Sequence, residues 1–173
     1  MVNSKQIVAA VSVVVLVAIL AYPALSTGTV SILLRSAKIE EADHIYALVG
    51  NVRVHQQGQP SSDGWKLVSN QTQTVDLISL ENTTMTFAKQ QIPVGGYDGI
   101  RMEVSNVTWV FSNGTTSRLS VESPQIQTKL GFTAQTGREL TITLVLSGQM
   151  KDVSGTKFFV SNLNATLGGV SGP

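Results

Sequence analysis

The chain has 173 residues, with 12 Lys and Arg against 11 Asp and Glu, and only 13 % of its residues are charged. This length allows one domain with a substantial core, and the balanced charge lacks the clustered basic face of nucleic-acid-binding proteins. Because the chain has no cysteine, we expect no disulfide, no thiolate nucleophile and no cysteine-based metal site.

Residues 1–26 have the order of a secretory signal peptide: Lys5, the uncharged segment 7–25, and a small-residue exit ending at Ser26. Cleavage there would leave residues 27–173 as a single domain. Two alternatives stay open. The uncharged segment is long enough to be kept as a membrane anchor, or cleavage directly follows Lys5, as in archaeal type IV pilins. Each alternative places the rest of the chain outside the membrane, so we expect a secreted protein at the extracellular cell surface.

From residue 27 onward, apolar and polar residues alternate with the period of two that is typical of β-strands. Turn sequences rich in Gly, Pro, Asn, Asp and Ser separate eleven such segments: 28–37, 44–56, 64–68, 74–80, 84–88, 99–111, 117–121, 126–132, 139–148, 156–162 and 164–170. This pattern predicts an all-β fold, an immunoglobulin-like β-sandwich of roughly eight to ten strands. Residues 36–46 could also form a helical turn before the second strand.

Strict alternation also predicts which side chains share a face. In the second strand it places these residues together: Tyr46, Leu48, Val52 and Val54. The few aromatic residues include Trp65 and Trp109, whose positions favour the core or the sheet over a sugar-stacking platform.

Five of the eight asparagines begin an Asn-x-Thr triplet, the acceptor sequence for N-glycosylation. The predicted glycosylation sites are Asn70, Asn82, Asn106, Asn113 and Asn164. Their number favours an N-glycosylated surface protein, although a Thr-rich β protein also collects such triplets by composition.

The stretch QQIPVGGYDGIRMEV, residues 90–104, raises the possibility of a phosphate-binding glycine loop. Such a loop needs a helix and a Lys-Ser/Thr pair after its glycines, whereas a strand pattern follows here. We therefore expect a structural corner in which a tyrosine packs its ring and ties its hydroxyl to nearby backbone. Its residues are Pro93, Gly95, Gly96 and Tyr97.

The segments TVDLISL and FAKQQIPVGGYDGIRMEV, preceded by GTVSILLRSAKI, NVRVH and GWKLV, resemble domain-of-unknown-function family 4382, a family of secreted prokaryotic β domains. The resemblance covers residues 28–104. It implies a location and a fold but no activity. Family members often carry an Asp-rich turn after the first strand, and LLRSAKIEEAD departs from that pattern.

The organisation is also similar to that of archaeal thread filament subunits, which assemble by donor-strand complementation. After cleavage, residues 27–37 would form a free strand without proline and with its first charge at Arg35. The donor residues would be Thr29, Val30, Ile32 and Leu34. Partners would then be copies of the chain in a homopolymer or other surface proteins, together with N-linked glycans.

The alternative is that the first strand closes its own sheet. The chain would then be a monomeric or membrane-tethered, surface-layer-associated glycoprotein or binding module. It would use loops such as residues 56–64, QQGQPSSDG, for recognition.

Catalytic patterns are weak in this sequence. No nucleophile-elbow motif links a serine to His44 or His55. Asp76 and Glu103 could form a glycosidase pair, but a strand-end position favours a turn carboxylate that holds backbone amides for Asp76. Residues 40–44, EEADH, could hold a calcium ion weakly, but they lack EF-hand spacing and favour a solvated connection. We expect no enzyme, no metal and no cofactor.

Overall fold

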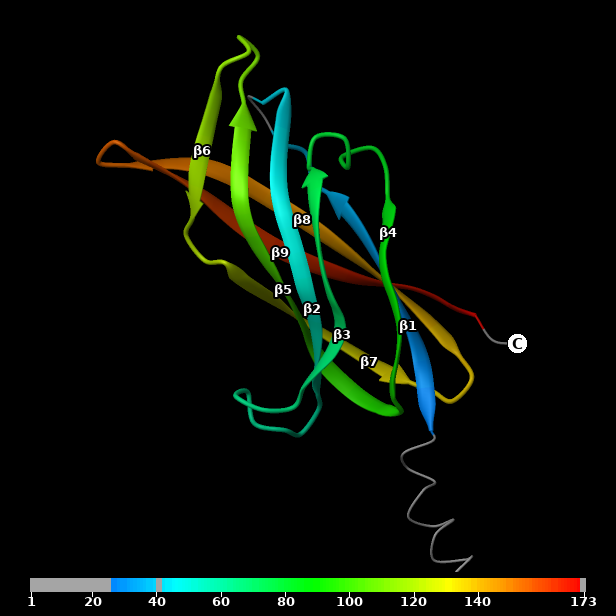
Figure 1. The fold of residues 1–173 in the computed structure, drawn as a ribbon. Helices are drawn as coiled ribbons and strands as arrows, with labels where there is room; N and C mark the ends of the chain where they lie inside the picture. The colour runs from blue at the N-terminus through cyan, green and yellow to red at the C-terminus, as the bar shows by residue number, and fades with distance from the viewer. Residues whose placement is uncertain (1–25, 40–41, 172–173) are drawn as a thin grey trace, which may run out of the picture.

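The computed structural model describes residues 26–39 and 42–171. The described chain has nine strands and no helix, which confirms the all-β fold class (Figure 1). The strands are β1 (Thr27–Ser36), β2 (His44–Gln56), β3 (Trp65–Asp76), β4 (Met85–Pro93), β5 (Gly95–Val110), β6 (Thr116–Val121), β7 (Gln125–Ala134), β8 (Glu139–Val153) and β9 (Thr156–Ser171). Apart from Ser26, the predicted signal segment lies outside the described residues.

The strands form two layers that share one strand. One layer has the order β3-β2-β5 with β7 also paired to β5, and the other has the order β9-β8-β1-β4. Strand β6 joins them, because it pairs antiparallel with β5 and then, through Ser120 and Val121, parallel with β9. In Figure 1, β2, β3 and β5 run steeply and β8 and β9 cross them obliquely.

The core lies between the layers and is built from alternate residues of most strands. Fully buried side chains include Ile32 and Leu34 of β1, Ile100 of β5, and Ile142 and Leu144 of β8. Burying one such side chain contributes about 1.5–3 kcal/mol. The period-two pattern of the sequence therefore corresponds to one core face and one outer face on each strand.

Two pairs of predicted strands are single strands in the structure. The segments 64–68 and 74–80 belong to β3 and the turn after it, and the segments 156–162 and 164–170 both belong to β9. In β3 the polar residues 70–74 are all exposed. They resemble a loop in sequence, yet their backbone pairs with β2. The pattern failed there because an edge strand needs no buried side chain.

The predicted face of β2 is wrong in its first half. Tyr46 is 40 % exposed, whereas its neighbours Ile45 and Ala47 are fully buried. The pairing register shifts around Asn51, whose φ is +49°. A bulge inserts one extra residue and thereby moves all later side chains to the opposite face. Val52 consequently points into the core, on the same side as Ile45.

The described residues between 36 and 46 contain no helical turn. Their backbone amides are already bound elsewhere: that of Ser36 donates to Leu80 O and that of Ala37 to Leu146 O, both at 2.9 Å. The amide of Ile39 donates to Oε1 of Glu81 at 2.7 Å. These contacts to two different elements hold the connection extended.

Candidate functional site

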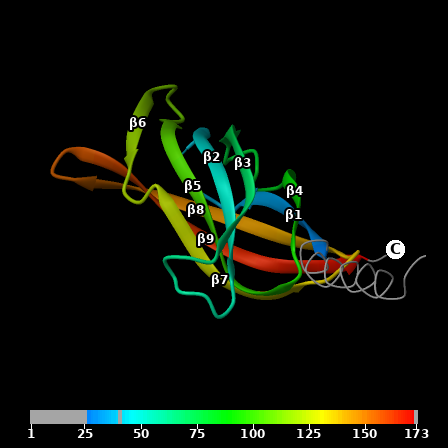
Figure 2. The same cartoon turned by 60° about the horizontal axis from the view of Figure 1, so that its bottom comes forward.

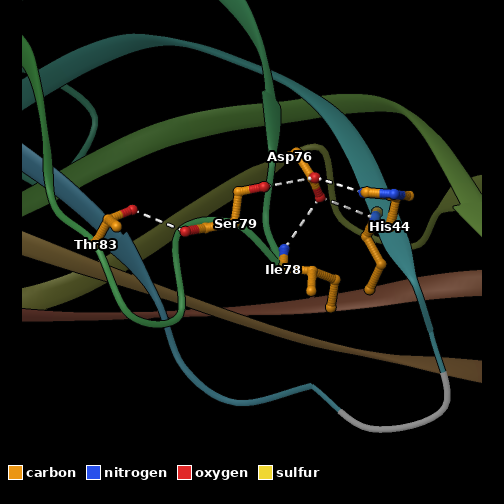
Figure 3. Close-up of polar contacts among 6 residues, drawn as sticks. His44, Asp76, Ile78, Ser79 and Thr83 are labelled. Carbon is orange, nitrogen blue, oxygen red and sulfur yellow. Dashed lines mark hydrogen bonds and ion pairs between the residues drawn. The ribbon is translucent and has the colours of Figure 1, made fainter.

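The carboxylate of Asp76 joins β2 to the turn after β3 through hydrogen bonds, as Figure 3 shows. Its Oδ2 atom lies 2.7 Å from Nδ1 of His44 and accepts the hydroxyl of Ser79 at 2.8 Å. Its Oδ1 atom accepts the amides of Ile45 and Ile78, both at 3.2 Å. The interpretation of Asp76 as a turn carboxylate that holds backbone amides is confirmed.

The hydrogen bonds of this cluster hold β2 and the turn after β3 together. Burial alone would raise the pKa of Asp76, but the hydrogen bonds from His44, Ser79 and the two amides outweigh it and lower the pKa. The hydroxyl of Ser79 donates to Asp76, whereas nucleophilic catalysis requires a serine bonded to the histidine. Glu103 lies opposite Gly50 of β2, and Asp76 lies opposite Tyr46 of the same strand. These two positions of β2 are four residues apart. That is about 13 Å along the strand, farther than the spacing of glycosidase carboxylates.

An open groove of about 820 Å³ lies where loop 56–64 meets β5 and β7. In Figure 2 this loop and β7 come forward together. Its volume falls within the range of small-molecule sites. The groove lining includes His55, Trp65, Asp98, Arg101, Gln127 and Lys129.

Hydrogen bonds of His55 and Trp65 hold loop 56–64 in place beside this groove. Nδ1 of His55 lies 2.7 Å from Oδ1 of Asp98, and its Nε2 lies 3.1 Å from the carbonyl oxygen of Pro60. The indole Nε1 of Trp65 donates to the carbonyl oxygen of Ser61 at 2.9 Å. Hydrogen bonding to Asp98, and then to Pro60, raises the pKa of His55.

Arg101 lies over the ring of Trp65, with Cζ 4.1 Å from the ring centroid. Its Nε atom is buried and has no hydrogen-bond partner among the described residues. Arg53 lies directly opposite Arg101 in the pairing of β2 with β5. Burial lowers the pKa of Arg101 and the charge of Arg53 lowers it further, while the charge of Glu103 acts in the opposite direction. Two cations therefore share this part of the outer sheet surface.

The carboxylates near these cations are engaged by other side chains. Asp98 is bonded to His55, and Oε2 of Glu103 accepts the Asn51 amide at 2.6 Å. Within the described part of the chain, Arg53, Arg101 and Lys129 take part in no ion pair. Arg101 and Lys129 of the groove lining are therefore free to meet an anion, as is Arg53 beside the groove, although the Asp98 carboxylate also lines it.

The predicted corner residues lie together at the junction of β4 and β5. The ring of Tyr97 is 2 % exposed and stacks on Phe132 with centroids 5.0 Å apart, and its hydroxyl donates to the Pro93 carbonyl at 2.8 Å. Burial raises the pKa of this phenol. Gly95 has a φ of +145°, which favours glycine, and a Cβ on Gly96 would meet Oε1 of Gln57 at 2.5 Å.

The predicted donor residues lie in β1, between antiparallel β4 and parallel β8 of the same chain. Val30, Ile32 and Leu34 are fully buried there, and Thr29 is half-buried and opposite Gln91. On the outer surface, Glu139 of β8 forms an ion pair with Lys89 of β4 at 2.6 Å and accepts the hydroxyl of Ser31 at 2.5 Å. Hydrogen bonding to Lys89 and Ser31 lowers the pKa of Glu139.

All five predicted glycosylation asparagines are exposed, and none lines the groove. Asn82 and Asn113 lie in the β3–β4 and β5–β6 connections, at the end of the molecule opposite loop 56–64 (Figure 1). Asn106 lies in β5, where its Oδ1 accepts Nη2 of Arg118 at 3.4 Å. The other two, Asn70 and Asn164, lie in β3 and β9.

The described residues offer neither a clustered metal site nor a membrane-spanning helix. The described chain contains no group of three or more His, Asp and Glu side chains arranged to hold a metal ion. Glu40 and Glu41 of the predicted acidic segment lie outside it. Residues 26–39 and 42–171 also include no helix of the length and apolarity that a bilayer requires.

The groove residues were not identified as a group from the sequence. Alternation places Arg53 with His55 and Arg101 with Glu103, but only the register of β2 against β5 brings the two arginines together. That register depends on bulges at Asn51 and elsewhere, which no local pattern predicted.

The structure thus defines a two-layer β-sandwich with an open, cationic groove on one outer surface. Residues 27–155 match the model of a domain of unknown function, DUF4382, and the chain belongs to that family. No match was found among curated protein sequences or among solved structures.

Proposed function

We propose that this chain is a non-enzymatic, N-glycosylated binding module of the extracellular cell surface. The observation that carries this proposal is the groove between loop 56–64 and strands β5 and β7. It combines a fastened loop, a stacked Trp–Arg pair and amide side chains, the kind of convergent polar groups by which binding sites orient a ligand. The positions of the predicted glycans support the proposal, because they leave the groove uncovered.

A titration of the full chain, purified in mild detergent, with neutral and acidic oligosaccharides tests this function. Calorimetry should detect binding of at least one oligosaccharide. Gly99→Leu should abolish that binding, because Gly99 lines the groove and a Cβ there meets only ordinary contacts at 3.5 Å or more. The larger side chain would occupy part of the groove, and an unchanged urea midpoint would show that the sheet is intact. Gly131→Leu is the control, since nothing lies within 4 Å of a Cβ at Gly131. Binding that persists in Gly99→Leu would refute the groove as the site.

A second proposal is assembly into a cell-surface filament by exchange of β1. Eight residue pairs join β1 to β4 and eight join it to β8. Its three fully buried apolar residues contribute roughly 5–9 kcal/mol, comparable with the whole stability of a domain. The slot between β4 and β8 therefore needs a strand, and the β1 of a neighbouring copy would make the same contacts.

A disulfide trap separates the two proposals. Thr29→Cys and Gln91→Cys place one cysteine in β1 and one opposite it in β4, in a chain without other cysteines. Oxidation would give a ladder of covalent multimers on a denaturing gel if β1 is exchanged. It would give only cross-linked monomers if each chain keeps its own β1, and the filament proposal would then fail.

A further inference from the structure

The pairing of Arg53 with Arg101 is unfavourable by itself. The two residues are directly opposite each other in β2 and β5, a distance of about 4.5–5.5 Å between their Cβ atoms. Like charges in such a pair destabilise a sheet. No described carboxylate forms an ion pair with either guanidinium. The charge of Glu103 offsets part of this repulsion, and an anion bound beside both guanidinium groups would turn the remainder into attraction.

Arg101 is held in position before any ligand arrives. Its guanidinium lies 4.1 Å from the centroid of the Trp65 ring, and its Nε atom is buried without a hydrogen-bond partner. A stacked guanidinium loses little side-chain freedom on binding, and its planar fork of donors matches a carboxylate in two parallel hydrogen bonds. Arg101 covers one face of Trp65, so this face is less available to stack on a sugar. The group that recognises the ligand is therefore Arg101.

Strand β7 adds neutral and cationic donors along the same surface. Gln127 lies opposite Arg101, and Lys129 lies opposite Gly99. Because Gly99 lines the groove and has no side chain, the groove is deeper at this position. Amides and an ammonium group suit hydroxyl-rich ligands that also carry negative charge. A neutral or purely apolar ligand would leave the cations unpaired.

We infer that the groove binds an acidic saccharide, with the sugar hydroxyls against β7 and a carboxylate held by Arg101 of the groove lining and by Arg53, which lies opposite Arg101 beside the groove. This inference rests on the proposed binding function and names its ligand class. Arg101 supplies the fixed fork, Arg53 the second charge, and Gln127 and Lys129 the contacts to the rest of the ring.

Calorimetric titration of the full chain with oligogalacturonate tests the inference, with a maltooligosaccharide of equal length as the neutral probe. Oligogalacturonate should bind and the neutral probe should not. Arg53→Gln and Arg101→Gln should each weaken binding about 10- to 100-fold, as expected for loss of a charge-assisted hydrogen bond. Arg35→Gln, at an exposed arginine of β1, is the matched control and should leave binding unchanged.

Stability provides the second readout. Arg53→Gln removes half of a repulsive pair, so the variant should resist urea as well as the parent chain or better while losing affinity. A variant that unfolds more easily in proportion to its loss of binding would overturn the direct role of Arg53. Arg101→Lys keeps the charge but not the fork, and retention of full affinity by this variant would overturn bidentate recognition.

The outcomes also separate this inference from the proposed function. Equal binding of both probes in the groove, blocked by Gly99→Leu, would overturn the acidic ligand and keep the binding function. Binding of neither probe, together with arginine-dependent binding to vesicles containing phosphatidylglycerol, would transfer the anion from a saccharide to a lipid headgroup and overturn the inference. Binding of no probe or vesicle would contradict both.

Discussion

Asp76 illustrates how one carboxylate can replace several backbone contacts. It accepts two amides, one hydroxyl and one imidazole, and so joins the start of β2 to the turn after β3. A half-buried acceptor with four donors is costly to remove, because the amides of Ile45 and Ile78 are left without this partner.

Asp76→Asn should lower the free energy of unfolding by about 1–3 kcal/mol at pH 7, since an amide cannot accept at both positions. The lowered pKa of Asp76 means that its contribution is present above the unfolded value, about 3.9, and is lost as pH falls through the folded value. Urea unfolding should therefore show a smaller difference in stability between the parent chain and Asp76→Asn at pH 3 than at pH 7. Asp43→Asn, at an exposed residue, should have little effect at either pH.

Tyr97→Phe should cost about 0.5–1.5 kcal/mol of stability, because it removes the donor to the Pro93 carbonyl while keeping the ring on Phe132. Tyr46→Phe is the control, since Tyr46 is 40 % exposed. Equal unfolding midpoints for the two variants would show that the corner hydrogen bond adds no stability.

His55 should titrate above its usual pKa of 6.5, because Asp98 stabilises its protonated form. A raised folded pKa means that this stabilisation is complete below the unfolded pKa and is lost as pH rises through the folded one. Proton NMR should show the midpoint moving down in Asp98→Asn and staying in place in Asp152→Asn. An unchanged midpoint in Asp98→Asn would mean that Pro60 and the surrounding loop cause the shift.

At the scale of strands, the alternating pattern of the sequence predicted the strands but not the bulges that interrupt them. Alternation located all nine strands, because a half-buried strand must alternate. The bulges at Asn51 and Asn106, both with φ of +49°, have no such local signature in the sequence. Each changes the face of the residues that follow, so the error in β2 came from one residue.

The hairpin of β8 and β9 depends on a close approach at Gly148. A Cβ there would lie 2.0 Å from the ring of Phe159, a fully buried residue. Gly148→Ala should cost about 1–3 kcal/mol by overpacking, measured by thermal or urea unfolding. Gly131→Ala, with nothing within 4 Å of its Cβ, should be neutral or stabilising.

At the scale of the molecule, the fold class could be read from the sequence and the groove could not. Arg53 and Arg101 are 48 positions apart, and they meet only because β2 and β5 pair in one particular register. Loop 56–64 was expected to take part in recognition only under the alternative of a binding module, and it borders the groove. The corner tyrosine was predictable because its partner, Pro93, is four residues away.

The position of β1 has a mechanical consequence. Its ladders to β4 and β8 run along opposite sides of the same strand, and Ser26 leads directly into it. A force that pulls on Ser26 along the strand axis loads both ladders in shear, so their hydrogen bonds must break together and not one after another. Strand β9 pairs along its length with β8 but with β6 only through Phe158 and Phe159, so peeling β9 from β8 would instead break bonds one at a time. Whatever is tethered through the N-terminal end is therefore held by the more force-resistant of the two terminal strands, and single-molecule pulling should give a higher rupture force for β1 than for β9.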